Sequence, residues 1–443
     1  MAKKKQIELT IEEKLQNALV SKEEQPYKIP NNWCWTYIHN IAIVVTGKTP
    51  SKKNKEYYGG KFPFFKPADL DAGRNMQYAT EYLSEKGKSI SVIIPEKATG
   101  ICCIGTIGKC GYFLVEGTTN QQINTVISKI NPLYSYYFFN TNSFVRELIF
   151  KASATTIAIV NKSKLESCLF PVAPLNEQQR IVNRIESLFV KLDRAKELIE
   201  NTLAQFKQNK MAILHKAFTG ELTAKWRKEN NIDLSSWKKC ELKEVFKVVK
   251  DKYNPQTENQ IVNYIGLENI ETSKGIISKN NSSEVKSIKT KFKKNDVLYG
   301  KLRPYLNKHD VVNFDGICST DILVFRFNDI NTAKYINYYF NLPMFIQYAV
   351  ENSSGINLPR VSEKTISKYK ISLPTIEEQQ EIVNILDNLL AKYNKIKNLE
   401  QQLEKIELLK KAILAKAFRG ELGTNNPDEE SAENLLKEIL AEK

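Results

Sequence analysis

Histidine is scarce in this sequence of 443 residues, which has only three. The seven cysteines are few for the length and odd in number, which indicates reduced thiols in a cytoplasm instead of a disulfide framework. Cys102, Cys103 and Cys110 lie close together, but no histidine is near them in sequence and the paired spacing of zinc ligands is missing. We therefore expect a cytoplasmic protein without a metal site.

Long apolar runs are absent as well. No window holds 18 uninterrupted apolar residues, and the lysine-rich start MAKKKQIELTIEEK is not followed by the apolar stretch of a signal peptide. Catalytic signatures are also missing, since there is no Asn-Pro-Pro-aromatic tetrapeptide, no glycine triplet and no convincing pair of carboxylates for acid–base work. We expect a non-catalytic protein that needs no cofactor and contacts no membrane.

Positive charge, in contrast, is abundant. The chain has 65 Lys and Arg against 50 Asp and Glu, which gives a net charge of +15 and a pI near 9.2. Such an excess favours a polyanionic partner, with nucleic acid first and a membrane surface second. The length predicts two or three domains.

One phrase occurs twice, as KAFTGEL at 216–222 and as KAFRGEL at 416–422. The match extends upstream, where EQQRIVN at 177–183 has its counterpart in EQQEIVN at 378–384. Each copy follows a proline, and an acidic, amide-rich turn after a proline is a helix start signal. The glycine of TGEL or RGEL is a helix stop signal. The chain therefore contains an internal repeat of two copies, and each copy ends in a long helix.

These signals predict two helices of roughly 40 residues, each with a narrow apolar seam in 3–4 spacing. The seam of the first helix consists of Ile185, Leu188, Leu192, Ala195, Ile199, Phe206 and Ile213, with Thr202 and Asn209 as breaks. The seam of the second consists of Ile382, Ile385, Leu389, Ile396, Leu399, Leu403, Ile406 and Ile413, with Lys392 and Lys410 as breaks. Helices this long need a partner, and the other copy is the economical one. The alternative is that each helix packs on its own globular domain.

Two bodies precede these helices, from about 30 to 173 and from about 231 to 373. They open and end alike, with Trp33 and Trp237 at equivalent places, but their interiors differ strongly. Short apolar runs with Gly and Asn turns, such as GICSTDILVFRF and TNQQINTVISKI, predict strands of mixed domains. The predicted fold class is α+β, with two similar mixed α/β domains joined by two long helices that form an antiparallel coiled coil. Two bodies with similar ends and different interior sequences indicate two similar binding functions for different ligands.

Each body carries a basic stretch. The segment 48–66 has six lysines and five aromatic residues against one Glu, and the segment 281–310 has eight Lys and Arg against three acids. Lysines suit phosphate contacts, which fix position without reading sequence, whereas Arg, Asn, Gln and Thr reach base edges. The alternative for any single lysine is a solvated charged face.

The segment AIVVTGKT at 42–49 matches a loose phosphate-loop pattern, which would indicate nucleotide binding instead of DNA binding. A phosphate loop needs a glycine-rich turn whose amides hold phosphates, followed by a helix. Here the loop is stiff and β-branched, and Pro50 with a lysine run follows. A coiled-coil ATPase that uses this loop is the rival interpretation, and a structural adaptor without a nucleic-acid role is another.

The sequence resembles the specificity subunits of type I restriction-modification systems over nearly its whole length. The resemblance rests on PLNEQQRIV and PTIEEQQEIV, on KAFTGELTAKWR and KAFRGEL, and on NWCWTYIHNIA, TGKTPS, DVLYGKLRPYLNK and GICSTDILVFR. The tail NPDEESAENLLKEILAEK is similar to the family's C-terminal segment. Together these motifs are highly specific, although no single one would be.

The resemblance implies two target-recognition domains, each reading one half of a bipartite site in double-stranded DNA. It implies helices that set the spacing and dock two modification (methyltransferase) subunits, restriction (motor and nuclease) subunits that join them, and no catalysis by this subunit itself. The expected segments are an N-terminal conserved segment 1–29, recognition domain 30–173, central helix 174–219, linker and second recognition domain 220–373, distal helix 374–420, and an acidic amphipathic tail 421–443.

Base contacts vary with the target within such a family, so the candidate DNA-binding residues follow from position and chemistry alone. In the first body they are Lys48, Thr49, Ser51, Lys52, Lys66, Gln121 and Gln122. In the second body they are Lys301, Arg303, Tyr305, Asn357 and Arg360. The last two lie in SSGINLPRVS, a polar glycine loop like SATTIAIVNKS in the first body.

Overall fold

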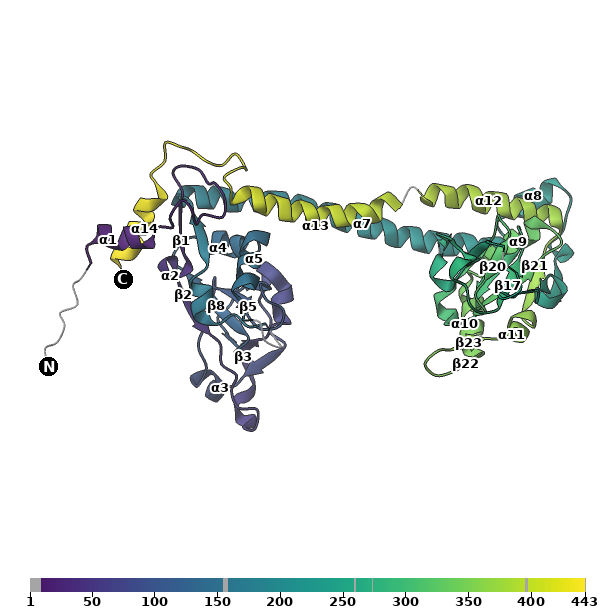
Figure 1. Ribbon diagram of the computed structural model, residues 1–443, viewed down its shortest axis with the longest axis horizontal. Helices are drawn as coiled ribbons and strands as arrows, with labels where there is room; N and C mark the ends of the chain where they lie inside the picture. The colour runs from purple at the N-terminus through teal and green to yellow at the C-terminus, as the bar shows by residue number, and fades with distance from the viewer. Residues whose placement is uncertain (1–8, 154–157, 259, 273, 395–396, 443) are drawn as a thin grey trace. The chain divides into compact units, whose positions relative to one another are not determined.

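A computed structural model describes residues 9–153, 158–258, 260–272, 274–394 and 397–442 of the chain (Figure 1). The chain divides into two compact units. Unit 1 comprises Met1–Leu198 with Gln401–Lys443, and unit 2 comprises Ile199–Glu400. Among the described helices, none is long and apolar enough to cross a membrane.

Unit 1 is built around a four-stranded antiparallel sheet in the order β2-β8-β5-β6. A three-stranded sheet, β4-β3-β7, and the pair β1-β9 accompany it. The strands are β1 (Cys34–Tyr37), β2 (Ala42–Thr46), β3 (Tyr58–Phe65), β4 (Glu81–Leu83), β5 (Thr99–Cys102), β6 (Cys110–Tyr112), β7 (Thr118–Thr119), β8 (Ile123–Ser128) and β9 (Leu169–Val172). The helices before the long one are α1 (Ile11–Ala18), α2 (Ile38–Ile41), α3 (Glu85–Ser89), α4 (Pro132–Phe139), α5 (Asn142–Lys151) and α6 (Lys162–Glu166), with the 3-10 helices η1 (Lys55–Tyr57) and η2 (Asp69–Asn75). The short α1 packs against the C-terminal α14 (Ala432–Ala441), and Lys437 pairs with Glu12 at 2.5 Å (Figure 1).

Unit 2 holds a four-stranded sheet in the order β11-β21-β18-β19 and a five-stranded sheet in the order β12-β17-β20-β13-β16. The strands of the first are β11 (Lys247–Val248), β21 (Ile322–Arg326), β18 (Val297–Gly300) and β19 (His309–Val311). The others are β10 (Lys238–Glu241), β12 (Lys252–Tyr253), β13 (Asn263–Ile265), β14 (Ile270–Glu271), β15 (Gly275–Ile276), β16 (Asn280–Asn281), β17 (Lys289–Phe292), β20 (Gly316–Cys318), β22 (Ser353–Ser354), β23 (Arg360–Val361) and β24 (Lys370–Leu373).

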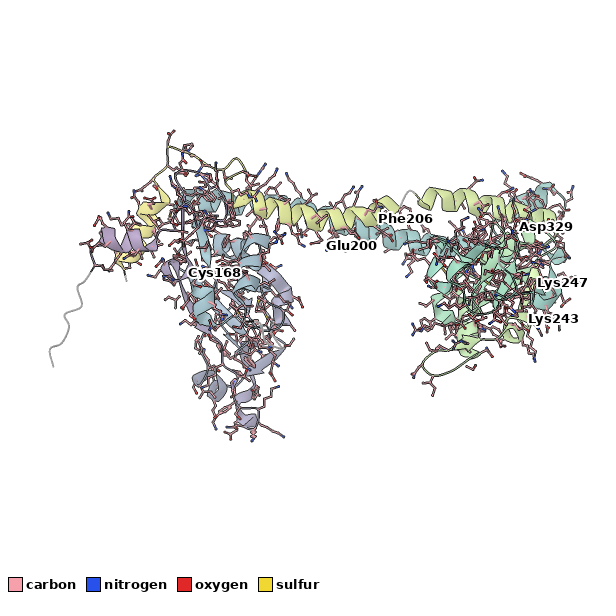
Figure 2. The ribbon with its side chains drawn as sticks, viewed as in Figure 1. Cys168, Glu200, Phe206, Lys243, Lys247 and Asp329 are labelled. Atoms are coloured by element: carbon pink, nitrogen blue, oxygen red, sulfur yellow. The ribbon has the colours of Figure 1, made fainter. Side chains whose placement is uncertain are left out.

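Short helices complete unit 2: α8 (Ala224–Glu229), α9 (Ile330–Tyr339), α10 (Pro343–Glu351), α11 (Glu363–Ser367) and the 3-10 helix η7 (Pro304–Leu306). Side chains specify where they begin. Asp329, labelled in Figure 2, caps α9 by accepting hydrogen bonds from the amides of Asn331 and Thr332 at 2.7 and 3.2 Å.

The two bodies share one frame. In each, the four-stranded sheet has the same strand order, the second strand of the sheet is followed by two helices, and a two-stranded pair closes the body, β1 with β9 and β10 with β24. The side chains that this frame carries differ between the two bodies, as the divergent sequences predict. The expectation of two similar α+β domains is therefore confirmed.

The long helices are α7 (Leu175–Phe218, 44 residues), α12 (Ile376–Asn394) and α13 (Lys397–Ala417), and the last two make up the expected distal helix. In unit 1, Ile185 of α7 lies in one core with Leu414 of α13. Asp193 then pairs with Lys410 at 2.5 Å and Lys196 with Glu407 at 3.0 Å, so residue numbers fall along α13 as they rise along α7.

This antiparallel pairing places much of the predicted seam at the contact, where Leu188, Leu192 and Ala195 are half-buried. In unit 2, the second part of α7 shares a core with α12 through Leu214 and Leu386. Ile396 and the side chain of Lys392, predicted for the second seam, lie outside the described residues.

The repeated phrase marks the end of each long helix. Gly220 and Gly420 have φ angles of +83° and +74°, which L-residues with a side chain rarely adopt, so glycine ends both helices as predicted. The chain then turns, and a threonine two or three residues after the GEL glutamate reaches a buried carboxylate in each copy. In unit 2, Thr223 donates to Glu378 of α12 at 2.6 Å, and in unit 1 Thr424 donates to Glu177 of α7 at 3.3 Å.

The same two carboxylates explain the repeated tryptophans. Trp33 donates its indole N–H to Glu177 at 2.7 Å, and Trp237 donates to Glu378 at 2.8 Å. Both glutamates have no exposed surface. Each EQQ motif therefore joins the first residues of its body to the end of a long helix. This joint explains why the tryptophan, the EQQ motif and the GEL phrase are all repeated.

One histidine is buried in unit 2. The ring of His309 stacks on Tyr299, its Nδ1–H donates to Asn337 Oδ1 at 2.7 Å, and its Nε2 accepts from Asn307 Nδ2 at 3.1 Å. Burial lowers the pKa of His309 to about 4, so the imidazole is neutral in the folded protein.

This burial predicts an acid-sensitive unit 2. The unfolded chain protonates His309 near pH 6.5, and the folded chain does so near pH 4, so the unfolded state binds the extra proton in between. Stability of unit 2 is expected to fall as the pH drops through this window, by at most about 3.5 kcal/mol at 1.4 kcal/mol per pH unit. Hydrogen exchange of β18, β19 and β21 in the full chain measures it, with His309→Gln as the variant that loses the dependence. An unchanged pH dependence in that variant would contradict the assignment.

Candidate nucleic-acid interface

Loops of unit 1 converge at one end of its four-stranded sheet. Gly47, directly after β2, donates its amide to Ile123 O at 3.1 Å, and Lys48 donates its amide to Thr119 O at 2.9 Å. A Cβ on Gly47 would lie 2.2 Å from Asn120 O, so glycine is needed for this close approach. The arrangement brings the turn after β2 against the turn before β8.

The predicted residues Lys48, Thr49 and Gln121 meet here. The hydroxyl of Thr49 donates to Gln121 Oε1 at 2.5 Å, and the side chains of Lys48 and Gln121 are exposed. Ser51 and Lys52 follow in the same loop and are exposed. Gln122 is half-buried and accepts a hydrogen bond from Asn120 Nδ2 at 3.0 Å, so it supports the loop instead of facing solvent freely.

Lys66 has a different environment. Its backbone lies beside this loop, because Asn120 donates its amide to Phe65 O at 3.2 Å. Its ammonium group, however, pairs with Glu81 at 2.6 Å and lies 5.8 Å from the ring centroid of Phe64. This pairing makes Lys66 less available to an outside phosphate than Lys48 is.

The segment 42–49 does not form a phosphate loop. Residues Ala42–Thr46 are the strand β2, and no turn of glycines precedes a helix there. The next helical element is the single 3-10 turn η1 at Lys55–Tyr57. The geometry therefore lacks the helix N-terminus that such a loop requires.

In unit 2, three segments meet around Asp321. The guanidinium of Arg360 donates to Asp321 at 2.9 Å, and the ammonium of Lys301 lies 4.0 Å from the same carboxylate. Hydrogen bonding to Asp321 raises the pKa of Arg360 above its ordinary value, so this group stays charged. Arg303 joins them, because its amide donates to Pro359 O at 2.7 Å. The structure thus brings together Lys301, Arg303 and Arg360, as predicted candidates from separate stretches.

The other two predicted residues of unit 2 lie close by in the chain. Tyr305 is 53% exposed on η7, directly after Arg303. Asn357 is exposed in the loop between β22 and β23. Both present polar groups to solvent next to the basic cluster.

Both loop clusters lie at the same end of the shared four-stranded sheet but on different loops, after β2 and before β8 in unit 1, and after β18 and before β23 in unit 2. The backbone at the ends of β5 and β18 matches closely. Cys103 donates its amide to Gln122 O at 2.8 Å in unit 1, and Lys301 donates to Asp321 O at 2.9 Å in unit 2. Isolated bridges join Ile104 with Ile159 and Leu302 with Arg360 in the same manner. The backbone is conserved between the copies, while the side chains at these places change from neutral to charged.

The backbone of Arg303 is unusual. Its φ is +53°, in the left-handed region that disfavours residues with a Cβ. The equivalent position of unit 1 is Gly105, with φ of +80° and no atom within 4 Å of a built Cβ. Unit 2 thus keeps an exposed arginine where the frame favours glycine. Backbone strain of this kind is typical of residues whose side chains have a function.

Sequence reasoning missed two features of unit 2. Asp321, which orients Arg360, lies inside the noticed motif GICSTDILVFR, but it is distant from Arg360 in sequence and the motif does not indicate this pairing. Ile356 is fully exposed and Leu358 is 44% exposed in the loop between β22 and β23. Two aliphatic residues inside a polar glycine loop were the available signal. The matching loop of unit 1 includes residues 154–157, which lie outside the described residues.

Metal-binding chemistry finds no support in the described part of the chain, where no three His, Cys, Asp or Glu side chains gather in a way that could hold an ion. The seven cysteines are free thiols and are buried. Burial raises the pKa of Cys103 to about 11, so its thiol is protonated at neutral pH.

Comparison with known proteins agrees with the geometry. The family described as type I restriction modification DNA specificity domain matches residues 30–205 and 235–408. The type I restriction enzyme EcoDI specificity subunit of Escherichia coli is 25% identical over 94% of this chain and 96% of its own length. The MjaIX specificity subunit of Methanocaldococcus jannaschii is 24% identical over 90% of this chain and 96% of its own length.

Solved structures show the same fold. A chain from a type I R-M system superposes with a TM-score of 0.68 at 18% identity and covers 89% of this chain and 100% of that one. The HsdS subunit from Thermoanaerobacter tengcongensis gives a TM-score of 0.55 at 18% identity, covering 90% and 99%.

Proposed function

Because the chain belongs to the type I restriction-modification DNA specificity family, we propose that it is the DNA-reading subunit of such a complex. The two bodies are its two recognition domains, and each reads one half of a bipartite site in double-stranded DNA. The observation that carries this proposal is the pair of loop clusters at the same end of the two four-stranded sheets, where the backbone frame is shared and the exposed side chains differ. Equivalent frames position two readers in the same way, and different side chains let each read its own bases.

The proposal includes partners. Two modification subunits dock on the long helices, and restriction subunits join the complex in the cytoplasm. The subunit carries out no reaction itself, and it needs no cofactor. Support comes from the relatives, which are specificity subunits of restriction enzymes, and from the long helices, whose length sets the spacer between the half-sites.

Individual side chains have distinct roles in this proposal. Lys48, Lys52 and Lys301 contact phosphates, whereas Thr49, Gln121 and Arg303 reach base edges. The exposed Ile356 inserts toward the bases beside the arginines, as apolar residues of DNA-binding loops do. A net charge of +15 favours this contact and makes it weaken with salt.

Exchange of one body tests the proposal. Residues 238–373 form a natural module, because β10 pairs with β24 from Lys238↔Leu373 and closes the body at both ends. Replacing this module by that of a relative is expected to change one half of the methylated motif and leave the other half intact. The measurement is methylation-sensitive sequencing of DNA from cells that express the chimaera with the modification subunit.

Exchange of residues 34–172, which β1 and β9 close in the same way, is the matched control and should change the other half. A chimaera that methylates an entirely new motif, or one that leaves the motif unchanged, would refute independent readers.

A further inference from the structure

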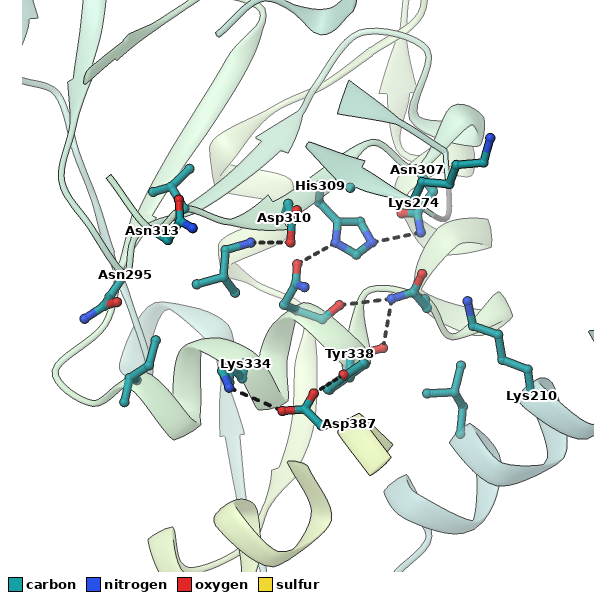
Figure 3. A pocket seen from close by; sticks show the side chains of 17 residues that line it. Lys210, Lys274, Asn295, Asn307, His309, Asp310, Asn313, Lys334, Tyr338 and Asp387 are labelled. Atoms are coloured by element: carbon teal, nitrogen blue, oxygen red, sulfur yellow. Dashed lines mark hydrogen bonds and ion pairs between the residues drawn. The ribbon is translucent and has the colours of Figure 1, made fainter. Parts of the chain in front are cut away.

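Unit 2 contains a cavity of about 600 Å³ that the proposed DNA contact does not use. Its lining comes from α7, α9 and α12, from the strands β15 and β19, and from the loops beside them (Figure 3). Three lysines, two aspartates and five asparagines are among the lining residues, so the cavity offers hydrogen-bonding groups beside apolar surface and carries a net positive charge.

The corresponding place in unit 1 is closed by the protein itself. Arg74, from η2, donates to Glu186 of α7 and to Tyr137 OH at 3.5 Å. Unit 2 retains the receiving pair, since Tyr338 donates to Asp387 of α12 as Tyr137 does to Glu186.

What unit 2 lacks is the closing arginine. The turn that carries Arg74 begins with Lys66 N donating to Asp69 Oδ2 at 2.7 Å, and its counterpart begins with Gly266 N donating to Asn269 Oδ1 at 2.8 Å. In this register Lys274 takes the place of Arg74. Lys274 pairs with Glu271 at 2.5 Å instead of reaching Asp387.

Lys210 supplies a cation without a counter-charge. Its counterpart in the repeat, Lys410, pairs with Asp193 at 2.5 Å in unit 1. The repeat places Asn394, a neutral residue, at the position of Asp193 in the second copy. Among the described residues, Lys210 has no hydrogen-bond or ion-pair partner, and it is largely removed from water, which lowers its pKa. A lysine of this kind favours an anion.

An acceptor without a donor lies in the same cavity. Asn307 is 7% exposed, and its Nδ2 donates to the neutral His309 at 3.1 Å (Figure 3). Its Oδ1 is buried and has no hydrogen-bond partner among the described residues. Leaving such an oxygen unsatisfied costs about 1–3 kcal/mol, so a donor from a ligand is favoured there.

We propose that this cavity binds a protonated phosphate group, either free phosphate or the terminal group of a phosphorylated small molecule. Its anionic oxygens face Lys210, and its P–O–H donates to Asn307 Oδ1. Sulfate and DNA phosphodiesters carry no such proton, so the site distinguishes them from phosphate. The bound group links α7 to β19 and takes the place that Arg74 fills in unit 1. The proposal does not depend on which DNA sequence the chain reads.

Calorimetric titration of the full chain at pH 5.5 and constant ionic strength tests this site, with inorganic phosphate, sulfate and ribose 5-phosphate as probes. At this pH both phosphate and the phosphate monoester, whose second pKa is about 6, carry the P–O–H that the site requires. One saturable site per chain is expected, with phosphate at least tenfold tighter than sulfate, because a hydrogen bond to a charged ligand contributes roughly 1.5–3 kcal/mol. Tighter binding of ribose 5-phosphate than of phosphate identifies a phosphorylated small molecule as the ligand, and the reverse order identifies free phosphate.

Variants locate the site. Lys210→Met is expected to weaken phosphate at least tenfold, while Lys207→Met, an exposed lysine of the same helix, leaves it unchanged. Asn307→Gly keeps the backbone, since φ is +42° there and the equivalent Gly108 has +86°, and should abolish the preference over sulfate. Lys274→Arg, which restores the unit 1 arrangement, should close the cavity without changing its charge. Absence of saturable phosphate binding, or equal affinity in Lys210→Met and Lys207→Met, would overturn the proposal.

Discussion

Replacing Glu378 by alanine is expected to destabilise unit 2 by about 3–5 kcal/mol, because it leaves a buried arginine without its counter-charge. Arg227 is 7% exposed, donates to Glu378 at 2.5 Å and also donates to Gly220 O at 2.5 Å. The carboxylate receives Thr223 and Trp237 as well. One substitution therefore removes the partner of three donors, two of them buried, and loosens the end of α7.

The repeat provides its own control. Glu177 occupies the equivalent place in unit 1, but its hydrogen-bond donors are the neutral Trp33, Thr424 and Asn425. Glu177→Ala is therefore expected to cost unit 1 about 1–3 kcal/mol, the penalty of unsatisfied neutral groups. Hydrogen exchange of β10 and β24 in the first variant, and of β1 and β9 in the second, measures each unit within the full chain. Equal losses in the two variants would show that the charge of Arg227 is not what sets the cost.

Replacing Arg303 by glycine should separate DNA binding from folding. The substitution removes a side chain worth about 1–3 kcal/mol when it reads a base edge, so affinity for the target should fall roughly 10- to 100-fold. Stability of unit 2 should stay equal or rise by about 1 kcal/mol, because glycine adopts φ of +53° without strain.

The measurement is a pair of titrations on the assembled methyltransferase complex, with the methylated motif as DNA and thermal unfolding as the second readout. Arg303→Lys is the matched variant, since it keeps the charge and loses the planar fork. It should retain the salt dependence of binding and lose part of the sequence preference. Unchanged affinity in Arg303→Gly would show that this arginine stands off the DNA.

The sequence predicted the frame well because the frame is periodic. The spacing of the apolar seams predicted the long helices, and Gly220 and Gly420 predicted where they end. Both signals are local in the chain. The joint between Trp237, Thr223 and Glu378 was not predicted, although each residue lay inside a noticed motif. Its members come from three separate segments, and only the folded chain brings them together.

The candidate site was predictable in part for the same reason. Lys48, Thr49 and Gln121 meet, and so do Lys301, Arg303 and Arg360, because turns at the same end of a sheet converge. Lys66 was chosen on charge alone, and charge does not reveal that Glu81 neutralises it. The role of Asp321 and the cavity around Lys210 could not be predicted, because each depends on which residues of separate segments meet in three dimensions.

The joining of the chain's two ends in unit 1 has a consequence for synthesis. Phe418 lies 4.9 Å from Tyr134 and 5.2 Å from Phe138 between ring centroids, and Leu436 and Leu440 belong to the same core. A ribosome delivers these residues only after all of unit 2 has been synthesised. The first body to be translated is therefore the last to be completed, and until then its aromatic core stays open to other proteins.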